Sequence, residues 1–139
     1  MTRTLMATPP ETDLDERARR IFEGLTLREK IGQKLLVAFR YWCPDDKPAC
    51  TVSTTQFNSV MGEALRNNAI GGVILFGNNL STLEQGRTLI GDLRNVPPVA
   101  DTLGLLLGVD EEGGSVFRLP RSTATVFPGN MALAAAWYA

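Results

Sequence analysis

Three short apolar runs, separated by helical patterns, constrain the fold of this chain more than any other feature. The runs are residues 34–39 (KLLVAF), 71–76 (GGVILF) and 103–110 (LGLLLGVD). Short, nearly continuous apolar runs of this kind are typical of strands buried on both faces of a parallel sheet. Because amphipathic helices separate them, the order strand, helix, strand, helix, strand predicts an α/β fold with right-handed crossovers.

The helical patterns lie before, between and after these runs. Apolar residues at helical spacing predict helices over residues 13–24, 54–67 and 130–139. Capping-box patterns at residues 26–29 and 81–84 predict two further helices, the second ending near Arg94.

The domain organisation follows from length. A chain of 139 residues holds one domain at most. We expect residues 1–12, which are polar and contain prolines, to be a disordered lead, and residues 13–139 to form one folded unit. Three strands cannot close an eight-stranded barrel, which needs about 200 residues or more. The last helix also has nothing evident to cover, so we expect this chain to be the front part of a longer fold.

Composition excludes several classes of function. The net charge is −1, from 14 basic and 15 acidic residues, so the clustered basic excess of a nucleic-acid-binding protein is missing. The longest apolar run falls far short of the roughly 20 residues of a membrane span. The chain has no histidine, which removes Ser-His-Asp and Cys-His nucleophilic sites and His-ligated zinc. No phosphate-binding loop occurs, which argues against a small doubly wound nucleotide-binding domain. We expect no cofactor and no metal.

The two cysteines leave two interpretations open. Cys43 and Cys50 bracket a polar segment that contains two prolines, which is typical of a surface loop. A disulfide between them would close this loop if the protein is exported, and two unrelated free thiols are the alternative. The N-terminus shows no apolar leader. The chain is therefore cytoplasmic if its start is native, and periplasmic or secreted if the disulfide forms and the native start lies upstream.

The strongest candidate site follows the third apolar run, in GVDEEGGSVFRLP, residues 108–120. Asp110 stands where the strand should end, and sites of parallel sheets lie at the carboxyl ends of strands. In a functional interpretation, Asp110 accepts hydrogen bonds from substrate hydroxyls and Arg118 returns as a fork-shaped donor. The glycine pair lets the backbone turn sharply near a ligand. The alternative is a solvated acidic turn in which Arg118 is only a counter-ion.

Other candidates are weaker. Arg40, Tyr41 and Trp42 follow the first run, and an arginine beside two aromatic residues suits either sugar-ring stacking or packing onto the cysteine loop. Asn78 and Asn79 follow the second run, where a turn is favoured over a ligand contact. Paired carboxylates raise glycoside hydrolysis on chemical grounds, but the acidic residues near Asp110 lie too close in sequence to flank a bond with assurance.

At these residues the chain resembles the N-terminal domain of glycoside hydrolase family 3, in its β-N-acetylhexosaminidase branch. Four segments carry the resemblance in the family's order: LTLREKIGQKLLVAF, IGGVILFGNNLSTLEQGRTLIGDLR, GVDEEGGSVFRL and FPGNMALAAA. Together they span roughly residues 20–139. The branch rests on the pattern D-x-E-G-G-x-V-x-R, because the β-glucosidase branch usually has a different, His-containing motif there. Two positions depart from the family: Glu111 replaces its usual Gln, and Ser115 its frequent Arg.

The resemblance implies a (β/α)8-type barrel of which the three strands are the first three. It implies that Asp110 binds hydroxyls of a terminal N-acetylglucosamine and that Arg118 helps to shape the same sugar site. The implied activity is retaining hydrolysis of terminal non-reducing N-acetylglucosamine from cell-wall or chitin-type oligosaccharides.

The resemblance places the catalytic residues elsewhere. The family's Lys-His segment, its His/Asp acid–base pair and its Asp nucleophile all lie beyond the third strand, and this chain has no histidine. We therefore assign no catalytic residue here and expect this chain alone to be inactive. A truncated remnant that acts as a non-catalytic sugar-binding or interaction module is the alternative.

Overall fold

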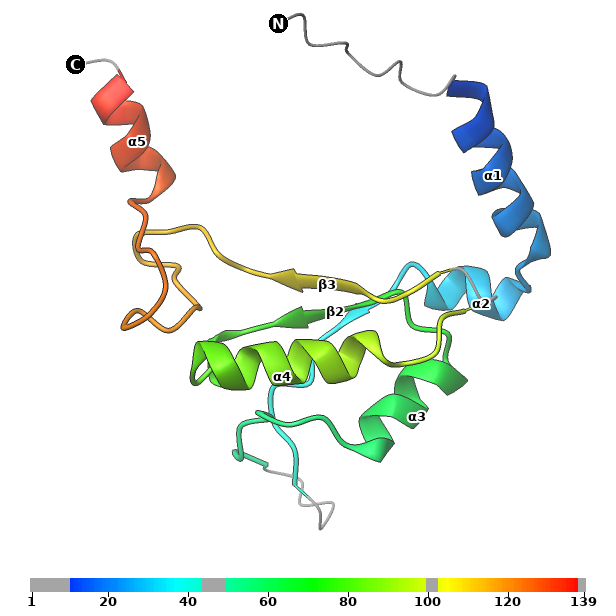
Figure 1. Cartoon of the computed structure of the whole chain (residues 1–139), viewed down its shortest axis with the longest axis horizontal. Helices are drawn as coiled ribbons and strands as arrows, with labels where there is room; N and C mark the ends of the chain where they lie inside the picture. Colours follow the sequence, from blue (N-terminus) through cyan, green and yellow to red (C-terminus); the bar gives the residue numbers. More distant parts are fainter. Residues whose placement is uncertain (1–10, 44–49, 100–102, 138–139) are drawn as a thin grey trace, which may run out of the picture.

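A computed structural model describes residues 11–43, 50–99 and 103–137 (Figure 1). The elements, in chain order, are α1 (Glu11–Gly24), α2 (Leu27–Gly32), β1 (Leu36–Val37), α3 (Ser59–Asn67), β2 (Gly72–Leu75), the 3-10 turn η1 (Gly77–Asn79), α4 (Leu83–Arg94), β3 (Leu106–Val109) and α5 (Asn130–Trp137). None of the helices in these ranges is long and apolar enough to cross a membrane.

The three strands form one parallel sheet in the order β1-β2-β3, which confirms the predicted α/β fold. Leu36 pairs with Gly72, and Gly72 pairs with Leu106 on its other side. Successive strands are therefore neighbours, and all three carboxyl ends point to the same edge of the sheet.

The outer strands are shorter than the apolar runs indicated. Residues 34 and 35 belong to the turn out of α2, since their N–H groups donate to the carbonyls of Ile31 and Gly32. Leu103 pairs with Val99 in an antiparallel bridge before β3 begins. In both places local hydrogen bonds occupy backbone N–H groups that a longer strand would have offered to the sheet.

Side-chain caps set the helix starts. The Thr26–Glu29 capping box is present at α2, as predicted. The helix expected from residue 54 begins only at Ser59, because the Asn58 side chain accepts a hydrogen bond from the Met61 N–H and caps α3 there. At α4 the cap is Thr82, which accepts from the N–H of Gln85, one position after the predicted box.

The core lies between the sheet and the two helices α3 and α4, which cover one of its faces (Figure 1). Val73 and Leu75 of β2 meet Leu65 of α3 and Leu89 and Leu93 of α4, and all five are buried. These contacts hold the central strand, and through it the carboxyl edge of the sheet, in place.

The prediction that all three strands are buried on both faces was wrong for the outer two. Leu36 is 48% exposed and Leu106 is 69% exposed, whereas Gly72 between them is buried. The described part of the chain places helices α3 and α4 on the opposite face only (Figure 1). The apolar character of these runs therefore exceeds what this chain buries.

The two terminal helices extend away from the sheet (Figure 1). Every residue of α5 is exposed, including Met131 at 87% and Trp137 at 86%, in agreement with the expectation that this helix covers nothing evident. The predicted disordered lead falls mostly on residues 1–10, which lie outside the described residues, and α1 begins at Glu11, two residues before the predicted start.

Candidate functional site

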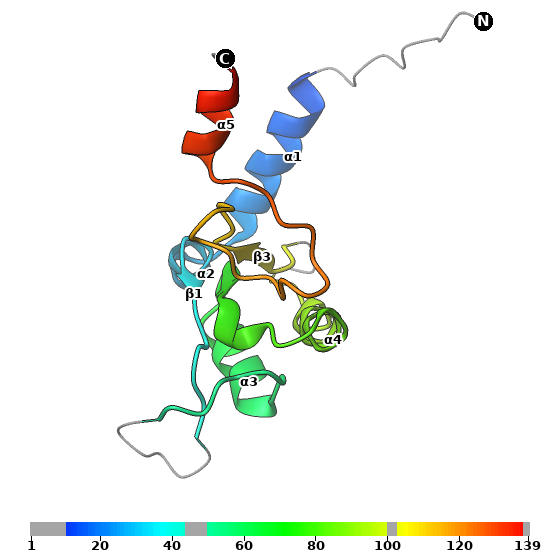
Figure 2. The same cartoon turned by 90° about the vertical axis from the view of Figure 1, so that its left-hand side faces the viewer.

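The loop after β3 lies at the carboxyl edge of the sheet, the edge that faces the viewer in Figure 2. Asp110 is the first residue after the strand. Ligands of parallel α/β sheets bind at this edge, because the loops that leave the strands gather there. The structure thus places Asp110 where the sequence placed it.

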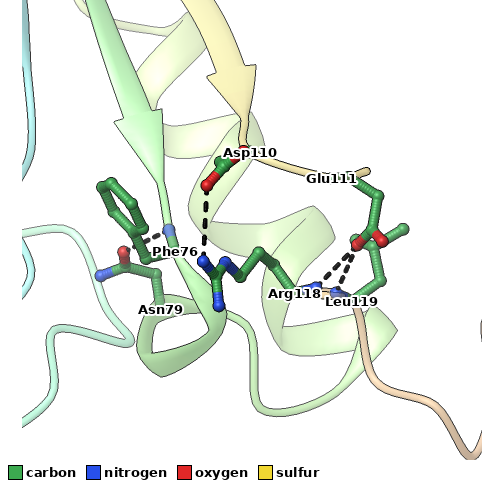
Figure 3. Close-up of polar contacts among 6 residues, drawn as sticks. All are labelled: Phe76, Asn79, Asp110, Glu111, Arg118 and Leu119. Carbon is green, nitrogen blue, oxygen red and sulfur yellow. Dashed lines mark hydrogen bonds and ion pairs between the residues drawn. The ribbon is translucent and has the colours of Figure 1, made fainter. Parts of the chain in front are cut away.

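Asp110 and Arg118 meet across this loop. The Nη2 atom of Arg118 lies 3.4 Å from the Oδ2 atom of Asp110, and the two side chains point toward each other (Figure 3). Their side chains remain 35% and 34% exposed, respectively. The pair is therefore both formed and open to solvent, so a polar ligand can reach the carboxylate.

Glu111 fixes the position of Arg118. Its Oε2 atom accepts hydrogen bonds from the backbone N–H groups of Arg118, at 2.8 Å, and Leu119, at 3.0 Å (Figure 3). Desolvation of the carboxylate acts to raise the pKa of Glu111, but backbone hydrogen bonds from Leu119, Arg118 and Gly113, together with the charge of Arg121, outweigh it and lower that pKa. Glu111 is therefore a carboxylate that holds the loop, and a merely solvated acidic turn would not require this arrangement.

Two atoms of the site keep unused hydrogen-bonding capacity. Within the described residues, Oε1 of Glu111 and Nε of Arg118 are buried and have no hydrogen-bond partner. A buried polar atom without a partner is costly, so each is a place where a water molecule or a ligand group would be bound favourably.

The glycine pair makes the turn that the sequence predicted. Gly113 and Gly114 have φ angles of 73° and 55°, in the region that favours glycine. A Cβ atom on Gly113 would lie 2.7 Å from the carbonyl oxygen of Pro128, and the Gly114 N–H donates to the Phe127 carbonyl at 3.1 Å. The glycines thus let residues 127–129 pack directly against the start of the loop.

Asn79 ties the neighbouring loops together beneath this site. Its side chain is 1% exposed. It donates to the carbonyls of Phe39 and Thr54. It also accepts from the N–H of Phe76 (Figure 3). The Asn78 side chain donates to the Arg40 carbonyl. The amide NH2 groups of both asparagines therefore donate to backbone carbonyls, which supports their interpretation as turn residues.

The segment after β1 is a short hairpin closed by a disulfide. The backbone N–H of Trp42 donates to the Val52 carbonyl at 2.9 Å. A disulfide joins Cys43 and Cys50, whose Cα atoms are 5.6 Å apart. The guanidinium of Arg40 lies 4.7 Å from the centre of the Phe76 ring, so Arg40 packs against the end of β2. The described residues contain no group of His, Cys, Asp or Glu side chains suited to hold a metal ion.

Sequence reasoning missed the roles of Glu111 and Asn79. It treated Glu111 only as one of the acidic residues near Asp110, because the N–H groups that it binds come from residues seven and eight positions later. For Asn79, the signal was its place in the turn that follows a buried strand, where asparagine is common for turn reasons alone.

These features define a class: an α/β protein with a parallel sheet and a polar, solvent-open pair of charges at its carboxyl edge. The chain belongs to glycosyl hydrolase family 3, because residues 26–139 match the model of the family's N-terminal domain.

Relatives of known name agree with this assignment. The chain is 34% identical over 117 residues to β-hexosaminidase A of Pseudoalteromonas piscicida, a match that covers 81% of this chain and 20% of the relative. It is 32% identical to a family 3 β-N-acetylglucosaminidase structure from a Paenibacillus species, with a TM-score of 0.64, covering 81% of this chain and 19% of that one.

A third similarity is to NagZ of Neisseria gonorrhoeae, solved in complex with N-trifluoroacetyl-D-glucosamine. Here the identity is 25% and the TM-score 0.56, covering 75% of this chain and 26% of that one. This chain therefore spans about a fifth to a quarter of the length of the proteins it matches.

Proposed function

We propose that this chain is the N-terminal part of a β-N-acetylhexosaminidase, in which the sheet β1-β2-β3 forms the first three units of a (β/α)8 barrel. Two observations support the barrel. The strands are parallel and follow each other in chain order. Helices cover one face of the sheet, whereas Leu36 and Leu106 on the other face are exposed, as expected for strands whose inner face needs the rest of a barrel.

In this proposal Asp110 accepts hydrogen bonds from hydroxyls of the terminal N-acetylglucosamine, and Arg118 shapes the same sugar site. The single observation that carries it is the Asp110–Arg118 pair, solvent-open at the carboxyl edge of the sheet, within a matched family 3 domain. A carboxylate is an acceptor-only group, so it suits hydroxyl donors, and the guanidinium holds its orientation. Glu111 keeps Arg118 in place from behind.

The substrate would be a cell-wall or chitin-type oligosaccharide with a terminal non-reducing N-acetylglucosamine. Support comes from the names of the relatives, a β-hexosaminidase and β-N-acetylglucosaminidases, and from the amino-sugar analogue bound in the gonococcal structure. Hydrolysis would be retaining and would use residues that this chain does not contribute, since it has no histidine. The 139 residues alone would then have no hydrolase activity.

The test is to sequence the gene beyond codon 139 and to assay its complete product, and separately the 139-residue chain, with an aryl N-acetylglucosaminide. We expect the product to release the aryl group, with little action on the aryl glucoside, and the 139-residue chain to match a mock preparation. A stop codon directly after residue 139 would overturn the enzyme proposal in favour of a non-catalytic module. Hydrolysis by the 139-residue chain itself would overturn the proposal that catalysis needs further residues.

A further inference from the structure

A groove apart from the Asp110 site lies between the disulfide-closed hairpin and the start of α3. Its volume is about 320 Å³. Trp42 lines it from one arm of the hairpin, and Thr54, Gln56 and Phe57 line it from the other arm and the segment before α3. In the view of Figure 2, the hairpin runs away from the loop that follows β3. None of the residues that line the groove takes part in the Asp110–Arg118 pair.

The walls of this groove are held from several sides. The hairpin arms are joined by the Trp42–Val52 backbone hydrogen bond and by the Cys43–Cys50 disulfide. The Thr54 carbonyl accepts from the buried Asn79 side chain at 2.8 Å. A groove whose walls are fixed beforehand loses little conformational entropy when it binds a ligand.

The position of Phe57 depends on a glycine of α3. A Cβ atom on Gly62 would lie 2.9 Å from the tip of the Phe57 ring. A larger residue at position 62 would therefore push the ring out of its position. Phe57 also packs against the hydrophobic core. The ring is thus anchored on one side by the core and forms part of the groove on the other.

The chemistry of the groove is aromatic, polar and uncharged. Two aromatic residues line it, and no Asp, Glu, Lys or Arg does. Thr54 is only 4% exposed, so it forms a buried wall of the groove. Gln56 adds an amide that can donate and accept. Since a charged ligand would find no counter-ion there, the groove suits a neutral molecule with an apolar face and polar edges.

We propose that this groove is a second carbohydrate-binding site, which takes an uncharged N-acetylamino sugar ring of an oligosaccharide. The apolar face of the ring stacks on Trp42, and the Gln56 amide pairs with a hydroxyl or acetamido group of the sugar. The choice of an N-acetylated sugar rests on the proposed function, whereas the neutral, stacking character of the ligand rests on the groove itself.

The test is an NMR titration of the 139-residue chain with tri-N-acetylchitotriose, with maltotriose as the control saccharide. The chain has two tryptophans, so Trp137→Phe on the exposed helix α5 leaves the indole N–H of Trp42 as a single resolved signal. We expect that signal to shift in a saturable way with tri-N-acetylchitotriose and to stay in place with maltotriose. An unshifted signal, or an equal shift with maltotriose, would overturn the proposal.

A pair of variants tests the amide. We expect Gln56→Leu to weaken binding about three- to tenfold, the usual effect of losing one hydrogen bond. Thr51→Val changes an exposed threonine that does not line the groove, and we expect it to bind like the parent chain. Equal weakening by both variants, or no change with Gln56→Leu, would contradict the assigned role.

An Asp110→Asn variant separates this inference from the proposed function. We expect it to leave the titration of the Trp42 signal unchanged, because the groove and the Asp110 site share no residue. Loss of the Trp42 shift in Asp110→Asn would mean that there is one site and not two. If the Trp42 signal shifts in a saturable way but the complete gene product fails the hydrolase assay, the groove proposal is supported and the proposed enzyme function is overturned.

Discussion

The strongest stability prediction concerns Asn79→Ala, because one buried side chain joins three segments. Asn79 donates to the carbonyls of Phe39, at 2.9 Å, and Thr54, at 2.8 Å, and accepts from the N–H of Phe76, at 2.9 Å. These partners belong to the ends of β1 and β2 and to the hairpin arm. Alanine removes all three hydrogen bonds and leaves the backbone groups without their partner.

The expected cost follows from the number of bonds. A hydrogen bond contributes about 1 kcal/mol net, so the three together make Asn79→Ala about 3 kcal/mol less stable. For a chain of this size we take a urea dependence of about 2 kcal/mol per molar. The unfolding midpoint should then fall by about 1.5 M.

The assay is urea unfolding followed by circular dichroism, with Asn67→Ala as the matched control. Asn67 is the exposed last residue of α3, so its replacement should change the free energy of unfolding by less than about 0.5 kcal/mol. If Asn79→Ala unfolds within about 0.3 M urea of the parent chain, the hydrogen bonds of Asn79 do not hold these segments together.

Three further predictions concern the loop after β3 and the hairpin. The folded-state pKa of Glu111 is lowered from its usual 4.5, so its stabilising effect is present above that pH and is lost as pH falls through the folded value. Glu111→Gln, which cannot titrate, should flatten the acid limb of a stability–pH curve, and an unchanged limb would contradict this. Gly113→Ala should cost more than about 1 kcal/mol in urea unfolding, because of the positive φ and the clash with Pro128, and a neutral effect would refute the close approach. Replacing Cys43 and Cys50 together by serine should lower stability by about 2 kcal/mol, given the short loop they close, and equal melting with and without reductant would argue against the disulfide.

The sequence predicted the order and type of the elements well, since that order depends on local patterns. The Thr26–Glu29 capping box and the apolar run of β2 each act through residues close in sequence, and both were found where predicted. The start of α3 was predicted too early, at residue 54, whereas the helix begins at Ser59. Phe57 fits the apolar stripe of a longer helix, but it lies before α3 and its ring packs against Gly62.

Burial could not be read from the same patterns. Leu106 sits in a run as apolar as that of β2, yet it is 69% exposed, whereas Val73 of β2 is fully buried. An apolar run indicates that a strand can be buried on both faces. Whether it is buried depends on segments that lie far away in the chain.

The residues of the candidate site were likewise predictable only where they depend on local sequence. Asp110 was predicted because a strand end and its following residue are local features. The role of Glu111 depends on the path of the loop, which brings the N–H groups of Arg118 and Leu119 to its carboxylate. No local sequence pattern predicts this path. The groove that Trp42 and Gln56 line likewise forms only when the hairpin and the segment before α3 come together in the fold.

The most direct test of the central claim is the kcat/KM of the complete gene product for an aryl N-acetylglucosaminide, measured for Asp110→Asn beside Asp92→Asn. Asp92 is a half-buried carboxylate of α4, in a different element from the loop that carries Asp110. If Asp110 binds sugar hydroxyls, its loss should lower kcat/KM about 10- to 100-fold, the usual effect of losing hydrogen bonds to a charged group, while Asp92→Asn matches the parent enzyme. Equal kcat/KM values for the two variants would contradict the assignment of Asp110 to the sugar site.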